Sequence, residues 1–330
     1  MRSIRLLRTA ALATALACAL PLPGHADDAD VPTRIVDVMN QLFGKHPGQR
    51  ANHAKGIVAQ GSFQPGAAGA QLSSAALFAG DPLPVTVRFS DATGLPTLPD
   101  GDPNASPHGM AVRFLLPDGS QMDIVANSLP VFPVAAPEDF LALLQAVAAS
   151  GPNAAKPTAL DNFVASHPSV PAATGSLATP SSFARETYNG VNAFVFVDAA
   201  GKRQPFRFKI TPVDGPEHLT AADAAGQAPD FLIDELPVRL AKAPARFRLA
   251  AQLAEPGDPT ADATRPWPAD RKLVELGTIT LDRMDPDSAA ASQELLFLPT
   301  NLIDGIEPSD DPLIDARTAA YAVSFQRRSE

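Results

Sequence analysis

The feature of this sequence that most restricts its fold is a series of short segments in which apolar and polar residues alternate. Each segment is bounded by glycine, proline, asparagine or aspartate, residues that favour turns. The segments are residues 56–63, 84–90, 109–116, 121–126, 192–198, 203–211, 245–253 and 273–282. Turns as short as Pro117-Asp118-Gly119 join neighbouring segments. The pattern therefore predicts antiparallel hairpins that close into an eight-stranded β-barrel.

Helical segments accompany the predicted strands. Apolar residues recur every three to four positions in residues 31–43, 137–149, 156–166, 230–242 and 311–328. The second of these begins with Pro137-Glu138-Asp139, and acidic residues in a first turn favour the start of a helix. The proline-rich loops 91–107 and 256–268 have neither the length nor the low complexity of a domain linker. We therefore expect a single α+β domain, with helices packed around the barrel.

Residues 1–26 have the pattern of a secretory signal peptide. Arg2, Arg5 and Arg8 precede an apolar stretch, residues 9–22, which is too short and too rich in alanine to span a bilayer stably. Small residues at Gly24 and Ala26 occupy the positions that signal peptidase reads. We expect cleavage after Ala26, a mature domain of residues 27–330, and a periplasmic location.

Composition excludes several classes of function. The chain has 26 Lys and Arg against 36 Asp and Glu, a net charge of −10, which argues against nucleic-acid binding. The only cysteine, Cys18, lies in the expected signal peptide. The mature domain then has no thiol for a disulfide, a metal site or a nucleophile.

Polar residues that could build a reactive site lie near the ends of predicted strands and on the last helix. They are Arg50, His53, Arg88, Ser90, Asn127, Arg317 and Tyr321. Arg317 and Tyr321 are four residues apart in a helix, so their side chains share one face. Taken singly, each residue has an ordinary alternative. A loop histidine or a strand arginine usually faces water, and an asparagine at a strand end usually belongs to a turn.

Taken together and in order, the motifs resemble the catalase family. The matching segments are Arg50-x-x-His53-Ala-Lys-Gly, Pro84-Val-Thr-Val-Arg88-Phe-Ser90, His108-Gly-Met-Ala-Val-Arg-Phe114, Asp123-Ile-Val-Ala-Asn127-x-x-Pro130-x-Phe132, Phe297-x-Pro299-x-Asn301, Gly305-Ile-Glu-Pro-Ser309 and Arg317-x-x-x-Tyr321. The order and approximate spacing hold from about residue 47 to residue 328. The resemblance implies a catalase-type barrel with a haem between its wall and the last helix.

The resemblance also implies a role for each residue. Tyr321 is expected to be the axial ligand of haem b, and Arg317 to stabilise its phenolate. On the opposite side, His53 is expected to be the general base for bound peroxide, Asn127 to orient the peroxide, and Ser90 to hold the His53 ring. Arg50, Arg88 and Arg328 are expected to pair with the haem propionates. Phe132 is expected to pack against the porphyrin.

The sequence departs from full-length catalases in two ways. In both it resembles the short branch called catalase-related peroxidases. The sequence ends nine residues after Tyr321, so we expect it to lack the wrapping segment, the C-terminal helical region and any flavodoxin-like domain. Asn52 replaces the valine that usually precedes the distal histidine. A more open pocket would admit organic reductants. The resemblance thus implies reduction of hydrogen peroxide or organic hydroperoxides by a small-molecule electron donor, with weak catalase activity, in a monomer or homodimer.

Two other functions stay open at this point. One is an isomerase of fatty-acid hydroperoxides similar to allene oxide synthase, some of which carry a polar residue beside the distal histidine, as Asn52 does here. The other is an exported haem-binding protein without catalysis, although such a carrier needs no histidine and asparagine opposite its tyrosine. The donor and the preferred peroxide leave no motif. Solvated loop positions are expected for the remaining histidines with no assigned role, His46, His108, His167 and His218.

Overall fold

The computed structural model describes residues 30–329, so the expected signal peptide lies outside the described residues. The strands are β1 (Gly56–Pro65), β2 (Leu83–Ser90), β3 (Gly109–Leu115), β4 (Gln121–Asn127), β5 (Tyr188–Asn189), β6 (Phe194–Val197), β7 (Arg203–Pro212), β8 (Ala245–Leu253), β9 (Leu273–Met284) and β10 (Ile306–Pro308). The α-helices are α1 (Val31–Phe43), α2 (Gly69–Leu72), α3 (Pro137–Ala148), α4 (Ala159–Ser166), α5 (Ser169–Thr174), α6 (Ala221–Ala225), α7 (Phe231–Lys242), α8 (Ser288–Glu294) and α9 (Pro312–Ser329).

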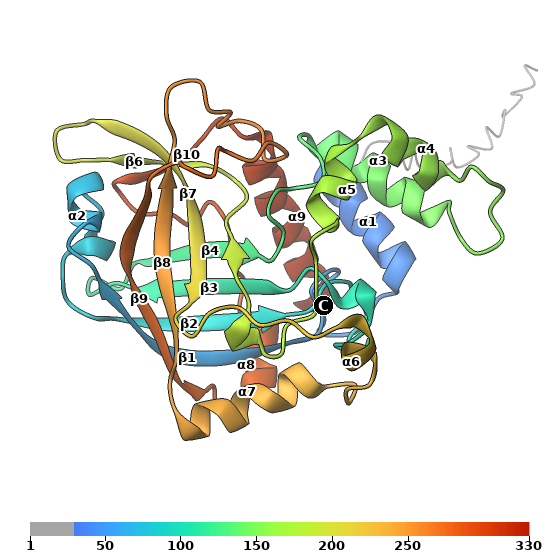
Figure 1. The fold of residues 1–330 in the computed structure, drawn as a ribbon, viewed down its shortest axis with the longest axis horizontal. Helices are drawn as coiled ribbons and strands as arrows, with labels where there is room; N and C mark the ends of the chain where they lie inside the picture. Colours follow the sequence, from blue (N-terminus) through green and yellow to red (C-terminus); the bar gives the residue numbers. More distant parts are fainter. Residues whose placement is uncertain (1–29, 330) are drawn as a thin grey trace, which may run out of the picture.

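The strands form one sheet that closes on itself. Its order is β10-β6-β7-β5-β4-β3-β2-β1-β9-β8, and a further pairing joins β7 to β8. A ring of eight antiparallel strands results, running β1-β2-β3-β4-β5-β7-β8-β9 and back to β1. Figure 1 shows the long strands wrapped around one interior. The predicted eight-stranded barrel is confirmed.

One member of the ring differs from the sequence prediction. The predicted strand 192–198 appears as β6, which pairs with the first part of β7 and with β10, outside the ring. Its place in the ring belongs to the two-residue strand β5. There Asn189 pairs with Asn127 of β4, and Tyr188 pairs with Ile210 of β7. Two residues are too few to show alternation, so no pattern in the sequence marks this strand.

Aromatic side chains fill the barrel interior. The rings of Phe63 and Phe114 meet edge to face with centroids 5.2 Å apart, and Phe89 stacks on Phe183 at 5.5 Å. All four side chains are fully buried. The interior is filled by such side chains, as is usual for a barrel of eight strands.

The outer face of β2, β3 and β4 presents a different set of residues. Arg88 pairs with Ala111, and Ala111 pairs with Val125, so the three form one rung across the strands. Successive strand residues point to opposite sides, so this rung faces outward while its neighbour Phe89 faces the core. The rung lines a cavity.

Helix α9 covers this outer face, and α1 and α3 lie beyond it (Figure 1). Helix α1 begins where the Asp30 carboxylate accepts a hydrogen bond from the Thr33 amide at 2.9 Å, and it ends at Gly44, whose φ of 82° suits glycine. Helix α9 begins at Pro312, where the Asp311 carboxylate accepts from the Leu313 amide at 3.0 Å. The five predicted helices are confirmed within three residues at each end. Among the described residues, no helix is both long and apolar enough to cross a membrane.

Candidate active site

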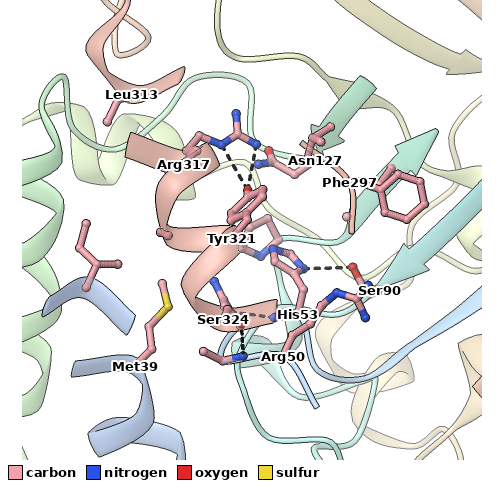
Figure 2. A pocket seen from close by; sticks show the side chains of 18 of the residues that line it. Met39, Arg50, His53, Ser90, Asn127, Phe297, Leu313, Arg317, Tyr321 and Ser324 are labelled. Atoms are coloured by element: carbon pink, nitrogen blue, oxygen red, sulfur yellow. Dashed lines mark hydrogen bonds between the residues drawn. The ribbon is translucent and has the colours of Figure 1, made fainter. Parts of the chain in front are cut away.

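A cavity of about 330 Å³ lies between the outer face of the barrel and α9. Its size falls in the range of small-molecule sites. All nine residues predicted from the sequence line it, and they are Arg50, His53, Arg88, Ser90, Asn127, Phe132, Arg317, Tyr321 and Arg328. The structure therefore brings the predicted set together, from segments that span most of the chain (Figure 2). Their individual roles stay predictions.

His53 lies in the loop that leads into β1, with a backbone conformation that is unusual for its type. Its φ is 56°, in the left-handed region, which few residues other than glycine adopt. Two neighbours hold it there. The Asn52 side-chain oxygen accepts from the His53 amide at 3.0 Å, and Arg88 donates to the His53 carbonyl at 2.9 Å. The polar residue before the histidine thus supports the loop.

The His53 ring is held and kept neutral by its surroundings. Its Nδ1 lies 3.1 Å from the Ser90 hydroxyl, as Figure 2 shows. Burial and the Arg88 guanidinium lower the pKa of His53 to about 4, against the opposing effect of a hydrogen bond with the Asp91 backbone. At neutral pH the ring is therefore an uncharged base.

Asn127 and Phe132 line the same cavity as His53. Asn127 is the last residue of β4, and its side-chain oxygen accepts from the Leu129 amide at 2.9 Å. This bond orients the amide and leaves its NH₂ group to donate. Phe132 lines the cavity and contacts Phe140 of α3, with ring centroids 5.3 Å apart.

Tyr321 faces the cavity from α9, and Arg317 lies one turn earlier. The Arg317 guanidinium donates from Nε at 3.2 Å and from Nη2 at 3.1 Å to the Tyr321 hydroxyl (Figure 2). Its Nη1 donates to the side-chain oxygen of Asn192, whose amide donates to the Asp311 carboxylate at 2.8 Å. Sequence reasoning missed Asn192 and Asp311. They fix the guanidinium that stabilises the tyrosine oxygen.

Three guanidiniums that line the cavity make no ion pair with any carboxylate of residues 30–329. Among the described residues, no carboxylate pairs with Arg50, Arg88 or Arg328, which donate instead to backbone and hydroxyl oxygens near Ser292 and Leu295. Burial lowers the pKa of Arg50 to about 7, Arg88 to about 9 and Arg328 to about 10, and charge repulsion from neighbouring guanidiniums adds to the effect on the first two. Such a cluster requires an anion.

These observations fit a haem. Tyr321 offers a phenol oxygen beside a guanidinium, which is a ligand set suited to ferric iron. The three unpaired arginines match two propionates, and side chains such as Leu313 and Phe297 supply apolar walls. The donor set, the excess positive charge and the lining of the cavity all agree with this group.

The sequence expectation for His108 is wrong. It was expected in a solvated loop, but it is fully buried, with 0% of its surface exposed, where Asp91 and Phe183 pack around it. The other three histidines reach the surface in part. Each of them contacts a neighbouring residue. The ring of His167, for example, stacks on that of Phe163 with centroids 3.8 Å apart.

The closed barrel, its external cavity and the tyrosine beside a guanidinium define a haem-binding β-barrel protein. A family model described as "Catalase" matches residues 34–329. The chain belongs to the catalase family. This result agrees with the resemblance found in the sequence motifs.

Individual relatives agree with this assignment. The chain is 35% identical to a protein named "Catalase-related peroxidase" from Mycolicibacterium paratuberculosis, covering 90% of this chain and 95% of the relative. It is 33% identical to another of that name from Synechococcus elongatus, covering 93% and 91%. A solved fungal catalase superposes with a TM-score of 0.77 at 21% identity, which shows a shared fold. The match covers 89% of this chain and 62% of that catalase.

Proposed function

We propose that the protein is a haem-dependent peroxidase that reduces hydrogen peroxide or an organic hydroperoxide with electrons from a small-molecule donor. Its catalase activity is weak. The observation that carries the proposal is that one cavity is lined by Tyr321 and Arg317 from α9 and by His53 and Asn127 from the barrel, with Arg317 bonded to Tyr321 and Ser90 to His53. Two relatives named catalase-related peroxidase support it.

The group that we propose for the cavity is haem b. When bound, it would supply the iron and the porphyrin ring that together take up the two oxidising equivalents of the peroxide. Tyr321 would hold this iron through its phenolate oxygen, and the two hydrogen bonds from Arg317 would stabilise the negative charge. The guanidiniums of Arg50, Arg88 and Arg328 would form ion pairs with the two haem propionates.

His53 and Asn127 would handle the peroxide. Because its pKa is lowered to about 4, His53 is free at neutral pH to accept the proton of a bound peroxide. It returns this proton to the oxygen that leaves as water. For Nε2 to act as this base, Nδ1 must carry the ring proton. Nδ1 then donates a hydrogen bond to the Ser90 hydroxyl. The Asn127 amide donates to the peroxide and orients it for the transfer.

The experiment that tests the function is an absorption spectrum of the haem-loaded protein, followed by rapid mixing with hydrogen peroxide. We expect a high-spin ferric spectrum of tyrosinate type. Mixing should change it, and a phenolic donor should restore it. Fast oxygen release without a donor would instead make the protein an efficient catalase, and the absence of any haem band would overturn the assignment of Tyr321.

A second measurement separates the peroxidase from an isomerase. The haem-loaded protein is incubated with a polyunsaturated fatty-acid hydroperoxide, with and without a phenolic donor. A peroxidase yields the corresponding alcohol, and only when the donor is present. Conversion to an allene oxide or its hydrolysis products without a donor would contradict the proposal.

We also propose that the protein is exported to the periplasm and acts there as a monomer or homodimer. The location rests on the basic and apolar pattern of residues 1–26. Sequencing the amino terminus of protein isolated from its own host tests it. A terminus at Asp27 supports export, whereas an intact Met1 contradicts it. Light scattering of the same material gives the oligomeric state.

A further inference from the structure

A buried histidine–aspartate pair lies directly behind His53. His108 is 0% exposed and Asp91 is 1% exposed, and His108 Nε2 lies 3.5 Å from an Asp91 carboxylate oxygen. The strand register brings them together. Ser90 pairs with Gly109 across β2 and β3, Asp91 follows Ser90, and His108 precedes Gly109. The two side chains therefore leave adjacent strands at one level.

This pair is not explained by stability. Both carboxylate oxygens of Asp91 and both ring nitrogens of His108 lack a hydrogen-bond partner among the described residues. A buried polar atom without such a partner destabilises a fold, and apolar residues of similar shape would pack here at lower cost. Four such atoms at one place, beside a catalytic histidine, indicate a chemical role.

The pair is close to the distal histidine. A Cβ atom on Gly109 would lie 3.2 Å from His53 Nδ1 and 2.7 Å from the Ser90 hydroxyl, so the absence of a side chain lets the ring lie against β3. The Asp91 backbone also hydrogen-bonds with His53. Burial lowers the pKa of His108, and a positive charge on His53 would add to this effect, so the two rings are close enough to interact.

Charged groups continue from the pair to the surface. Asp100, which is 0% exposed, lies beside Asp91. The Lys55 ammonium forms ion pairs with Asp100 and, at 2.6 Å, with Asp230. The Asp230 side chain is 59% exposed. A continuous set of ionisable side chains thus connects the region behind His53 with solvent.

At neutral pH both members of the pair are uncharged. Burial and the Asp100 carboxylate raise the pKa of Asp91 to about 9, whereas burial lowers the pKa of His108 to about 3. The proton therefore rests on Asp91, and its transfer to His108 is uphill, so the ionised pair forms only transiently while its net charge stays zero. The other charged or titratable groups that face the pair are Lys55, Asp100, Arg88, His53 and His218.

We propose that Asp91 and His108 form a relay that carries protons from the surface at Asp230 to the distal His53 during donor-dependent turnover. This inference rests on the proposed function. Reduction of a hydroperoxide to an alcohol and water takes up two electrons from the donor and two protons. Disproportionation of hydrogen peroxide to water and oxygen takes up no net proton. When the donor delivers electrons without protons, the protons must come from solvent, and the relay gives them a path to His53.

Two donors of different chemistry test the relay in the haem-loaded protein. Ferrocyanide gives an electron and no proton, whereas hydroquinone gives a proton with each electron. The Asp91→Asn variant should oxidise ferrocyanide about tenfold more slowly, the lower end of what proton transfer by a placed side chain contributes. It should oxidise hydroquinone at a nearly unchanged rate. A matched control, Glu186→Gln, removes another buried carboxyl, which lies 3.1 Å from His218, and should leave the ratio of the two rates unchanged.

The outcomes separate the relay from the proposed function. An equal slowing of both donors, or of neither, in Asp91→Asn would overturn the relay while leaving the peroxidase assignment intact. A wild-type protein that oxidises neither donor would overturn both. If Asp91→Asn does not fold, His108→Gln serves for the same comparison, because its amide can neither take up nor release a proton at neutral pH.

Infrared spectroscopy of the haem-free protein provides a readout that does not depend on turnover. At pH 7 the relay requires a protonated carboxyl at Asp91, which gives a carbonyl stretching band distinct from that of ionised carboxylates. Asp91→Asn should remove this band, and Asp230→Asn, which changes an exposed carboxyl, should retain it. A spectrum that is the same in wild type and Asp91→Asn would contradict the proposal.

Discussion

Arg88 donates a hydrogen bond to the carbonyl oxygen of His53 at 2.9 Å, and the same guanidinium donates to the Ala54 carbonyl at 3.1 Å. The Arg88 side chain also borders the cavity. One buried guanidinium therefore holds the loop that carries His53 and belongs to the group of arginines that we propose to bind the haem propionates. Cofactor binding and the placement of the base are coupled through this side chain.

Replacing Arg88 tests the coupling. Arg88→Lys keeps the charge but loses the planar group that donates from Nη2 to two carbonyls and from Nε to the Ser292 hydroxyl. We expect about tenfold weaker haem binding and a slower reaction with peroxide, since a charge-assisted hydrogen bond contributes about 1.5–3 kcal/mol. Haem titration and rapid mixing measure the two effects. Arg248→Lys, at a half-exposed position paired with Glu275, is the control and should change neither.

The two tyrosines of the chain form a matched pair for mutation. Tyr321→Phe should abolish stable haem loading, because it removes the oxygen that receives both Arg317 hydrogen bonds. Tyr188→Phe removes a buried hydroxyl that donates to the Phe183 carbonyl at 2.8 Å. It should lower the free energy of unfolding by about 1 kcal/mol and leave haem loading intact. A Tyr321→Phe protein with an unchanged haem spectrum would exclude Tyr321 as the ligand.

The reaction with peroxide should show an acid limb set by His53. Its pKa is lowered to about 4, so the neutral base predominates above that value and is lost as the pH falls through it. We expect a second-order rate constant that is nearly flat from about pH 8 to about pH 5 and falls below about pH 4. Rapid mixing by pH jump measures it. A midpoint near the ~6.5 of an unperturbed histidine would show that the ring is not shielded as the structure indicates.

Asn192 should influence the electronic properties of the Tyr321 oxygen through Arg317, without binding the cofactor itself. Its side chain accepts from Arg317 and donates to Asp311, so Asn192→Leu leaves a buried carboxylate and a guanidinium without their link. We expect retained haem with a shifted charge-transfer band and a lower free energy of unfolding, by about 1–3 kcal/mol. Absorption spectra and urea unfolding measure these effects. Asn40→Leu, a partly exposed change in α1, is the control.

Elements with a local signal were predictable from the sequence. The helix Val31–Phe43 has its cap, its proline and its apolar spacing within a few residues, and the structure has the same bounds. Seven of the eight ring strands show alternation that burial on one face requires. Strand β5 could not be found, because its two residues are defined only by β4 and β7 on either side.

The contacts in the candidate site also include some that the sequence predicts and some that it does not. Arg317 and Tyr321 lie on one face of one helix, so their contact follows from spacing alone. Asn192 and Asp311 meet across 119 positions of sequence, and no local pattern announces such a contact. The burial of His108 likewise depends on the register between β2 and β3, which places it behind Ser90. Distant pairings decide these positions, and a single sequence does not display them.

The narrowest join in the barrel is the rung at which β4 meets β5, where Asn127 pairs with Asn189. By contrast, β1 and β2 are joined along a ladder that runs from Gly56 and Ser90 to Phe63 and Leu83. As the temperature rises, we therefore expect the pairing of β4 with β5 to open before the other strand pairings of the barrel. Asn127, which we propose to orient the peroxide, is held at that rung, so we expect its side chain to lose its fixed orientation while the barrel as a whole is still folded.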